Sequence, residues 1–238
     1  MALEAGIYRT DVTPPEGVHA GCWMLHTALA EGAHDPLEVT ALALRSGETT
    51  VALVGVDVCI LDQASVREAR RRVTELTGIP PEHVLINTSH THAGPPPSRG
   101  LADSRVEADA LEQYWFGLPG RIAGAVYGAT RRLQPAAAGF SIGQAPGVAV
   151  NRVDRTRPID ESVWVMRIDS RAGEPVAVVV AFACHPVTIA GQTPLWDADF
   201  PAPLRSQVRA GLGAEVCLFL QGASGDVAPW DFLSLIHI

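Results

Sequence analysis

The chain has 238 residues, of which 47% are hydrophobic and 18% are charged, a balance typical of one large globular domain with a buried core. A formal net charge of −8, with scattered arginines as its basic residues, argues against a nucleic-acid partner, because phosphate backbones need a concentrated basic surface. No apolar run reaches the roughly 18 residues of a transmembrane segment. The N-terminus shows no secretory signal, so we expect a cytoplasmic protein.

The first half of the chain is expected to contain strands around one amphipathic helix. Apolar runs predict strands at 7–15, 37–44, 50–60 and 83–88. Residues 46–48 form a plausible hairpin turn between the second and third of them. The 3.6-residue periodicity at 65–76 predicts a helix, and Gly78 stands where a helix stop belongs.

The second half continues the same alternation. A helical region is expected at 106–133, with a break at 117–120 where glycine and proline cluster. Further strands are predicted at 139–143, 162–168, 176–184 and 215–220, and a last helix at 201–210. This order indicates an α/β domain with a mixed β-sheet and flanking helices. Ligands usually bind in the loops after the strands of such sheets.

Two histidines separated by one residue, His90 and His92, follow the strand expected at 83–88. In an extended chain such residues point to the same side. Neutral imidazoles held in this way suit zinc, or one can bind a metal while the other donates a hydrogen bond to substrate. An HxH pair alone is weak evidence for a metal site, but its position after a buried strand strengthens that interpretation.

A third histidine, His185, ends the apolar strand expected at 176–184. By itself it fits a core histidine that is hydrogen-bonded at a strand end. Two apolar strands that each end in histidine nevertheless favour a shared metal site over two unrelated histidines.

Three other features follow or separate the expected strands. The Gly-rich segment 221–229 can approach a ligand with its backbone, or it can form a tight turn in which Asp226 caps backbone amides. Arg152, in a loop between strands, can clamp a carboxylate or an oxyanion. Asp197 and Asp199 precede a helix, and helix capping is the simplest explanation for them.

The four cysteines are far apart in the sequence and form no CxxC pair. Most of them lie in or beside strongly apolar runs. We therefore expect buried free thiols that behave as small hydrophobic residues at Cys22, Cys59, Cys184 and Cys217.

Taken in order, these motifs resemble the N-terminal catalytic domain of the neutral (alkaline, non-lysosomal) ceramidase family. The resemblance runs from residue 5 to about residue 230. It is carried by Ala5-Gly6-Ile7 with Asp11-Val12-Thr13-Pro14-Pro15, by Ser89-His90-Thr91-His92-Ala93-Gly94-Pro95, by Asn151-Arg152, by the strand that ends in His185, and by Gly225-Asp226-x-x-Pro229.

The resemblance implies a zinc-dependent amidohydrolase that cleaves an amide bond in a small N-acyl compound, such as a ceramide-like lipid, with a metal-bound water. At matching positions it makes His90 and His185 zinc ligands and places His92 beside the reacting group. It assigns Arg152 to the polar group of the substrate. In the Gly-Asp loop, the resemblance makes Asp226 a catalytic residue and Gly225 a substrate-binding residue.

One position departs from the family pattern. Ceramidases carry a serine directly before the proline of the Gly-Asp loop, where this chain has Ala228. Alanine cannot replace a hydroxyl that is tied to catalysis. A ligand-binding or inactive domain without turnover, or a metal-dependent esterase, therefore stays open beside the amidohydrolase.

The C-terminal segment also bears on the domain description. Residues 233–238 match the translation of a transposon-end sequencing adapter, so we expect a partial ceramidase-like domain at 1–232 followed by an adapter tail. In the family a later glutamate and tyrosine complete the zinc site. With two histidine ligands alone, we expect weak metal binding and a poor enzyme.

Overall fold

The computed structural model describes residues 2–22, 28–97, 102–189 and 193–230. Its strands are β1 (Leu3–Asp11), β2 (Glu38–Ser46), β3 (Thr49–Val56), β4 (Val84–Thr88), β5 (Gln134–Gln144), β6 (Ala149–Asn151), β7 (Ser162–Ser170), β8 (Pro175–Phe182), β9 (Val216–Gln221) and β10 (Val227–Pro229). Its α-helices are α1 (Gln63–Thr77), α2 (Arg105–Thr130) and α3 (Pro201–Leu212), and a 3-10 turn covers Pro81–His83. No helix in these ranges has the length and apolar character needed to cross a membrane.

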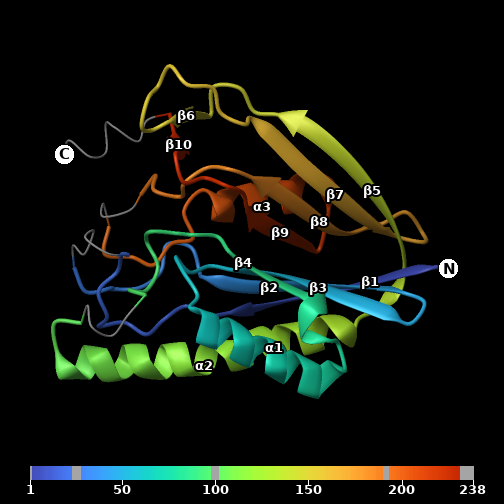
Figure 1. Ribbon diagram of the computed structural model, residues 1–238, viewed down its shortest axis with the longest axis horizontal. Coiled ribbons are helices and arrows are strands. Elements are labelled where there is room, and N and C mark those ends of the chain that lie inside the picture. The colour runs from blue at the N-terminus through green and yellow to red at the C-terminus, as the bar shows by residue number, and fades with distance from the viewer. Residues whose placement is uncertain (1, 23–27, 98–101, 190–192, 231–238) are drawn as a thin grey trace.

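Eight strands form one mixed sheet in the order β4-β3-β2-β1-β5-β7-β8-β9. The β3–β4 and β8–β9 pairs are parallel, and the other pairs are antiparallel. β1 and β5 share only two residue pairs, Glu4 with Pro135 and Ala5 with Gln134. The sheet bends at this short seam, so that β1–β4 and β7–β9 face one another (Figure 1). The predicted α/β fold with a mixed sheet is confirmed.

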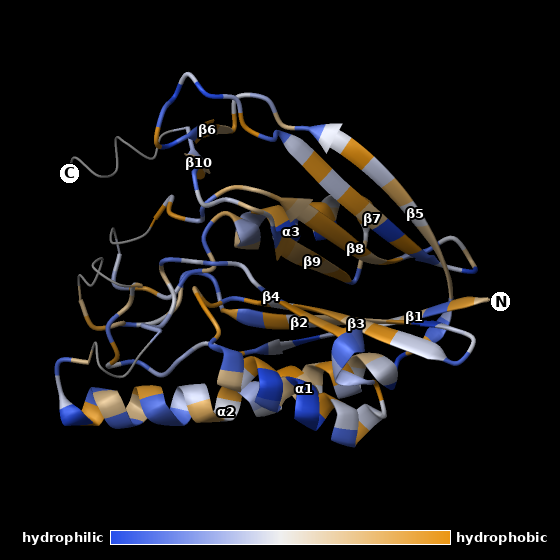
Figure 2. Ribbon diagram, viewed as in Figure 1, coloured by the Kyte–Doolittle hydropathy of each residue, from blue (hydrophilic) through white to orange (hydrophobic). Residues whose placement is uncertain are grey.

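The space between the two half-sheets is filled by apolar side chains. Figure 2 shows β8 and β9 as largely hydrophobic. Ile7 and Leu42 from the first half share a buried cluster with Ile168 and Leu218 from the second. The two halves approach closely at Gly55, because a Cβ there would lie 2.7 Å from Leu218 Cδ1. The two halves therefore form one core and position their strand ends relative to each other.

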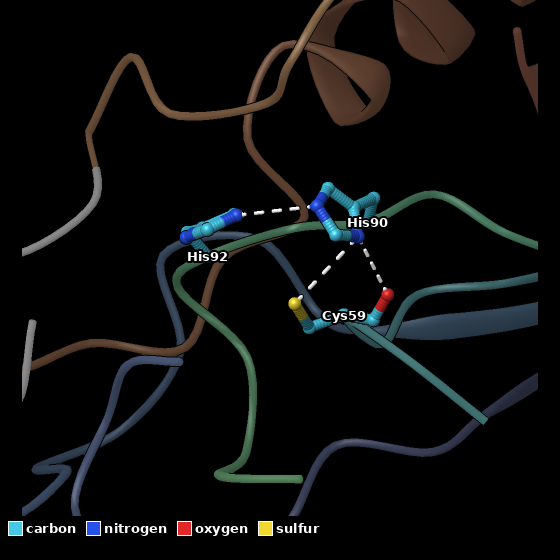
Figure 3. Close-up of side chains that lie close together, drawn as sticks. All are labelled: Cys59, His90 and His92. Carbon is cyan, nitrogen blue, oxygen red and sulfur yellow. Dashed lines mark hydrogen bonds between the residues drawn. The ribbon is translucent and has the colours of Figure 1, made fainter. Parts of the chain in front are cut away.

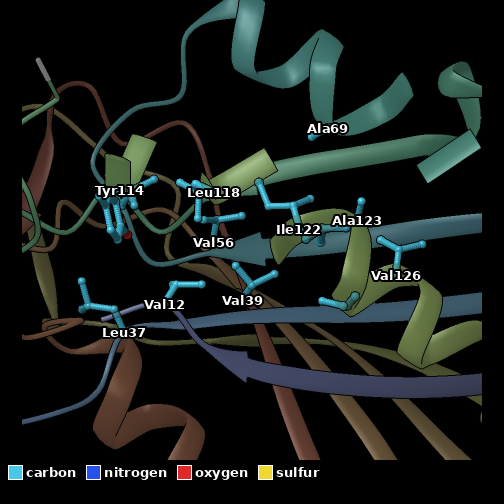
Figure 4. Packing of buried hydrophobic residues seen from close by; sticks show 14 of the residues in the cluster. Val12, Leu37, Val39, Val56, Ala69, Tyr114, Leu118, Ile122, Ala123 and Val126 are labelled. Atoms are coloured by element: carbon cyan, nitrogen blue, oxygen red, sulfur yellow. The ribbon is translucent and has the colours of Figure 1, made fainter. Parts of the chain in front are cut away.

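Helices cover the outer face of each half-sheet. α1 and α2 pack on β1–β4, where Val39 and Val56 belong to one buried cluster with Leu118 and Ile122 (Figure 4). α3 packs on β8 and β9 at the opposite side of the molecule. The layers are thus helix, half-sheet, half-sheet and helix.

Most predicted elements exist, with shifted boundaries. α1 ends as expected, since Gly78 adopts the left-handed conformation with φ of 75°. The break expected at 117–120 is wrong: α2 continues through Pro119, because the buried residues around it pack on the sheet and outweigh the lost hydrogen bond. The short strands β6 and β10 do not correspond to any predicted strand. They pair with each other outside the main sheet.

Candidate metal centre

Three strand ends meet at one edge of the molecule. The side chain of Asn87 on β4 connects the two half-sheets there: its Nδ2 donates to Gln221 O at 3.0 Å, and its Oδ1 accepts from Gln221 N at 2.8 Å. With these two bonds, the Asn87 amide replaces a backbone peptide group in pairing with β9. The loops that follow β4, β8 and β9 are therefore brought together, and they contain the predicted site residues.

His90 and His185 face each other across this junction. Nδ1 of His90 lies 2.8 Å from Cys59 O, and Nδ1 of His185 lies 2.9 Å from Ser224 O. Carbonyl oxygens only accept, so each Nδ1 donates a proton and each Nε2 of a neutral ring keeps its lone pair. The two Nε2 atoms are 3.1 Å apart. Such lone pairs repel one another unless a proton or a metal ion lies between them.

The separation fits a zinc ion. Two imidazole nitrogens on a tetrahedral zinc, each about 2.0–2.1 Å from the metal, lie roughly 3.3–3.4 Å apart. Metal-ligating histidines also commonly donate their other ring proton to a backbone carbonyl, as both rings do here. The orientation of the two rings, and a separation slightly below this range, are compatible with a shared metal ion.

His92 completes a group of three imidazoles. Its Nε2 lies 3.4 Å from Nε2 of His90 (Figure 3). Its ring centroid is 5.2 Å from that of His185. The backbone N–H of His92 donates to Pro186 O, which joins this segment to the loop after β8. The spacing allows His92 either to bind the same ion or to contact a group held beside it.

The extended conformation predicted through His90 and His92 is wrong. β4 ends at Thr88, and His90 has a φ of 67°. A positive φ is uncommon for histidine and is maintained by surrounding contacts. The His90 N–H donates to Val58 O, and its Nδ1 contacts Cys59, so the loop after β3 holds the strained turn.

The environment sets the charge of each histidine. Burial, and then the neighbouring charges of His90 and His185, lower the pKa of His92 to about 3. Burial also lowers the pKa of His185, although its bond to Ser224 opposes this effect. Contact with Cys59 raises the pKa of His90 against the effect of burial. His92 and His185 are therefore neutral near pH 7, as metal ligands must be.

Arg152 and the Gly-rich loop lie next to this cluster. The Arg152 guanidinium donates to Gly225 O from Nε at 3.0 Å and from Nη2 at 2.6 Å. Its positive charge contributes to lowering the pKa of His92 and His185. The Asp226 carboxylate accepts from Asn151 Nδ2 at 2.8 Å, so this carboxylate secures the β6–β10 pair.

An open pocket of about 330 Å³ lies at the junction. His90 and His185 line it together with the end of β4 and with residues 221, 222, 224 and 225 after β9. Gly225 thus borders the pocket. Ala228 is fully buried in β10, and Ser224 is bonded to Gln221 Nε2 through its hydroxyl.

The two aspartates before α3 do not cap it as expected. The helix begins after Phe200, which makes no side-chain cap bond. Asp197 instead accepts from His34 and from the Asp199 N–H. Asp199 accepts from Thr188 Oγ1 in the loop after β8, and among the described residues its carboxylate contacts the start of α3 only at the N–H of Phe200. The turn at Asp199, with φ of 60°, explains the difference, because it directs the carboxylate toward that loop.

Cys59 and Asn87 belong to the site although no sequence pattern connects them to it. All four cysteines are buried free thiols, as predicted, but Cys59 also lies near His90 and His92. Only the parallel pairing of β3 and β4 connects Cys59 to the histidines, because it places the residues that follow the two strands side by side.

The fold and the histidine group together define an α/β protein with a candidate metal centre at the ends of its parallel strands. Two solved structures have a similar fold. One is described as a ceramidase complexed with C2, with a TM-score of 0.80 and 19% identity over 96% of this chain and 39% of that chain. The other is neutral ceramidase from Pseudomonas aeruginosa, with a TM-score of 0.81 and 19% identity over 96% of this chain and 40% of that chain.

The fold is therefore that of a part of neutral ceramidase, and this chain spans about two fifths of the length of those chains. No protein-family model matches the sequence, and no curated protein sequence matches it.

Proposed function

We propose that this chain is the histidine-bearing part of a zinc-dependent hydrolase that cleaves an amide bond in a small N-acyl compound, such as a ceramide-like lipid. The observation that carries the proposal is the orientation of His90 and His185, whose Nε2 atoms face each other at 3.1 Å while both Nδ1 atoms donate to backbone carbonyls. The likeness of the fold to ceramidases supports an N-acyl substrate.

Each residue has a separate part in this proposal. His90 and His185 would hold zinc, which when bound lowers the pKa of a water molecule to about 7 and polarises a carbonyl. His92, neutral because its pKa is about 3, contacts the reacting group beside them. Arg152 provides positive charge toward the oxyanion that develops on the carbonyl oxygen. Gly225 O accepts from the Arg152 guanidinium and Asp226 O accepts from the Arg152 N–H, so the Gly-rich loop holds Arg152 in place.

One observation favours a second candidate, a domain that binds a ligand without turnover. Ala228 is fully buried and brings no hydroxyl to the position that carries serine in ceramidases. A third candidate is a metal-dependent esterase that uses the same histidines. These candidates differ in what is released from the substrate, and a direct assay separates them.

Metal binding is the first test. In excess zinc the Tm of the chain should rise, because an ion that binds only the folded state stabilises it. The rise should be small, because two histidine ligands alone bind zinc weakly. His90→Ala and His185→Ala should each lower the zinc affinity at least tenfold. His83→Ala, whose ring contacts Thr50 O far from the cluster, is the matched control. Full zinc content in both site variants would contradict the assignment.

Turnover is the second test, made with a panel of N-acyl lipids, N-acyl sugars and the corresponding esters. Zinc-dependent release of acid and amine supports the amidohydrolase. Cleavage of esters alone favours the esterase, and binding without product favours the non-catalytic domain. His92→Ala should abolish turnover while the zinc content changes little. A large loss of zinc in this variant would make His92 a ligand instead.

A further inference from the structure

Two cysteines that are distant in the sequence meet beneath the histidine group. Sγ of Cys22 lies 2.7 Å from Sγ of Cys59, and the two residues are 0% and 1% exposed. The separation is shorter than ordinary van der Waals contact between two sulfur atoms and longer than the roughly 2.03–2.05 Å of a disulfide bond. The position is therefore ready for a covalent bond between the two sulfur atoms.

Backbone contacts hold both cysteines in place. The Cys22 N–H donates to His92 O at 3.1 Å, and the Gly21 N–H donates to Gly94 O at 3.0 Å. On the other side, Cys59 O accepts from His90 Nδ1 at 2.8 Å and from Thr88 Oγ1 at 3.2 Å. Each cysteine is thus fixed to the same loop after β4 by its own main chain. Their proximity follows from this common attachment.

We infer that Cys22 and Cys59 are a redox-active dithiol that hydrogen peroxide converts into a disulfide directly behind the candidate metal centre. In the first step one cysteine attacks peroxide as its thiolate and becomes a sulfenic acid, and the released hydroxide takes up the thiol proton as water. Contact with Cys59 and burial raise the pKa of the Cys22 thiol, so we expect this step to be slow. The second cysteine then attacks this sulfur, which releases water. Overall, two thiols and one peroxide give one disulfide and two water molecules, so two electrons pass from the dithiol to the oxidant.

The other two cysteines lie in different surroundings and provide an internal comparison. Cys217 packs with Val178 and Val180 beneath α3, and Cys184 Sγ is 3.9 Å from His185 O. Among the described residues, neither of these two cysteines has its sulfur atom in contact with the sulfur atom of another cysteine. Burial alone therefore does not select a cysteine for oxidation to a disulfide. Contact with a second thiol distinguishes the Cys22–Cys59 pair.

The disulfide would connect the segment around Cys22 to the end of β3 and would close a loop between positions 22 and 59. Closing a loop of this size restricts the unfolded chain, so the oxidised protein should melt roughly 5–10 °C above the reduced protein. Because Cys59 also holds His90 through its carbonyl, the bond would stiffen the support of a candidate metal ligand.

Thiol counting and peptide mapping test the inference in the whole chain. The protein is reduced, freed of reductant, treated with a small excess of hydrogen peroxide, and alkylated after denaturation. The count should fall from the four free cysteines to two. Trypsin places Cys22 in peptide 10–45 and Cys59 in peptide 46–67, so the disulfide appears as one cross-linked pair that is lighter by two hydrogens.

Variants show that the bond is specific. Cys22→Ala and Cys59→Ala should each remove the cross-linked pair and the rise in Tm, whereas Cys217→Ala should retain both. If a variant fails to fold, the peptide map of the unchanged protein decides. Four titratable thiols after peroxide, a link through Cys184 or Cys217, or sulfinic acid without a cross-linked peptide would overturn the inference.

Discussion

The ion pair of Asp57 and Arg205 illustrates how single residues support the candidate site. The Arg205 guanidinium donates from Nη1 to Asp57 Oδ1 at 2.9 Å and from Nη2 to Oδ2 at 2.7 Å, and both residues are almost fully buried. Burial acts against the charge of Arg205, but Asp57 and then Glu38 outweigh it and raise its pKa. Asp57 directly follows β3, so the pair fixes α3 to the strand whose loop supports His90.

Arg205→Met should lower the free energy of unfolding by about 3–5 kcal/mol, because it leaves the buried Asp57 carboxylate without its cation. Urea denaturation at pH 7 measures the loss. Arg209→Met is the matched control on the same helix. Its side chain is 26% exposed, against 6% for Arg205, and its Nη1 lies 4.0 Å from Glu38 Oε1, so its loss should stay below about 1 kcal/mol. Equal losses in the two variants would contradict the role of the buried pair.

At the scale of elements, α1 shows how a local signal defines a helix. Asp62 is its N-cap, and the carboxylate accepts from the Ser65 N–H at 2.6 Å. This bond lowers the pKa of Asp62 below its ordinary value. At the other end, Gly78 closes the helix by donating its N–H to Thr74 O. Both ends are encoded in neighbouring residues, which explains why the periodicity and the stop signal locate this helix correctly.

Asp62→Ala should cost about 1 kcal/mol at pH 7, since a cap is lost at an exposed helix start. The folded pKa is depressed, so the stabilisation is present above the unfolded value of about 4 and is lost as the pH falls through the lower folded value. Urea denaturation at several pH values tests the sign. Asp62→Asn, which keeps the cap without a titrating group, should show a smaller loss with less pH dependence. A penalty for Asp62→Ala that grows as the pH falls would contradict this account.

For the whole molecule, the decisive feature is the close packing of the two half-sheets. A Cβ at Gly55 would meet Leu218 Cδ1 at 2.7 Å and Phe219 O at 2.9 Å. Gly55 therefore permits the approach of β3 and β9 that brings His90 and His185 within reach. The spacing of the site depends on the packing of the entire core.

Gly55→Ala should lower the free energy of unfolding by about 1–3 kcal/mol, because the extra methyl group forces the half-sheets apart. The same displacement should weaken zinc binding, which calorimetry measures together with the unfolding temperature. Gly139→Ala in β5 is the matched control, since a Cβ there meets nothing within 4 Å. Unchanged stability and zinc affinity in Gly55→Ala would show that the halves adjust freely.

Much of the fold is predictable from local pattern, because strand and helix periodicity depends on neighbouring residues. The hairpin of β2 and β3, the helix α1 and the apolar strands β4, β8 and β9 all follow from such patterns. The continuity of α2 through Pro119 does not, since it depends on burial against the sheet. β6 and β10 are also hidden from the sequence, because three-residue strands carry no period.

The candidate site divides in the same way. Residue types and their positions after apolar strands are enough to single out His90, His92 and His185. Their separations, the turn at His90 and the support from Cys59 arise from contacts between segments far apart in the chain. The histidines indicate in the sequence that a metal site is possible. Only the bend of the sheet between β1 and β5 and its packing at Gly55 bring these side chains together. A local pattern carries no information on distances across a core, and packing determines those distances.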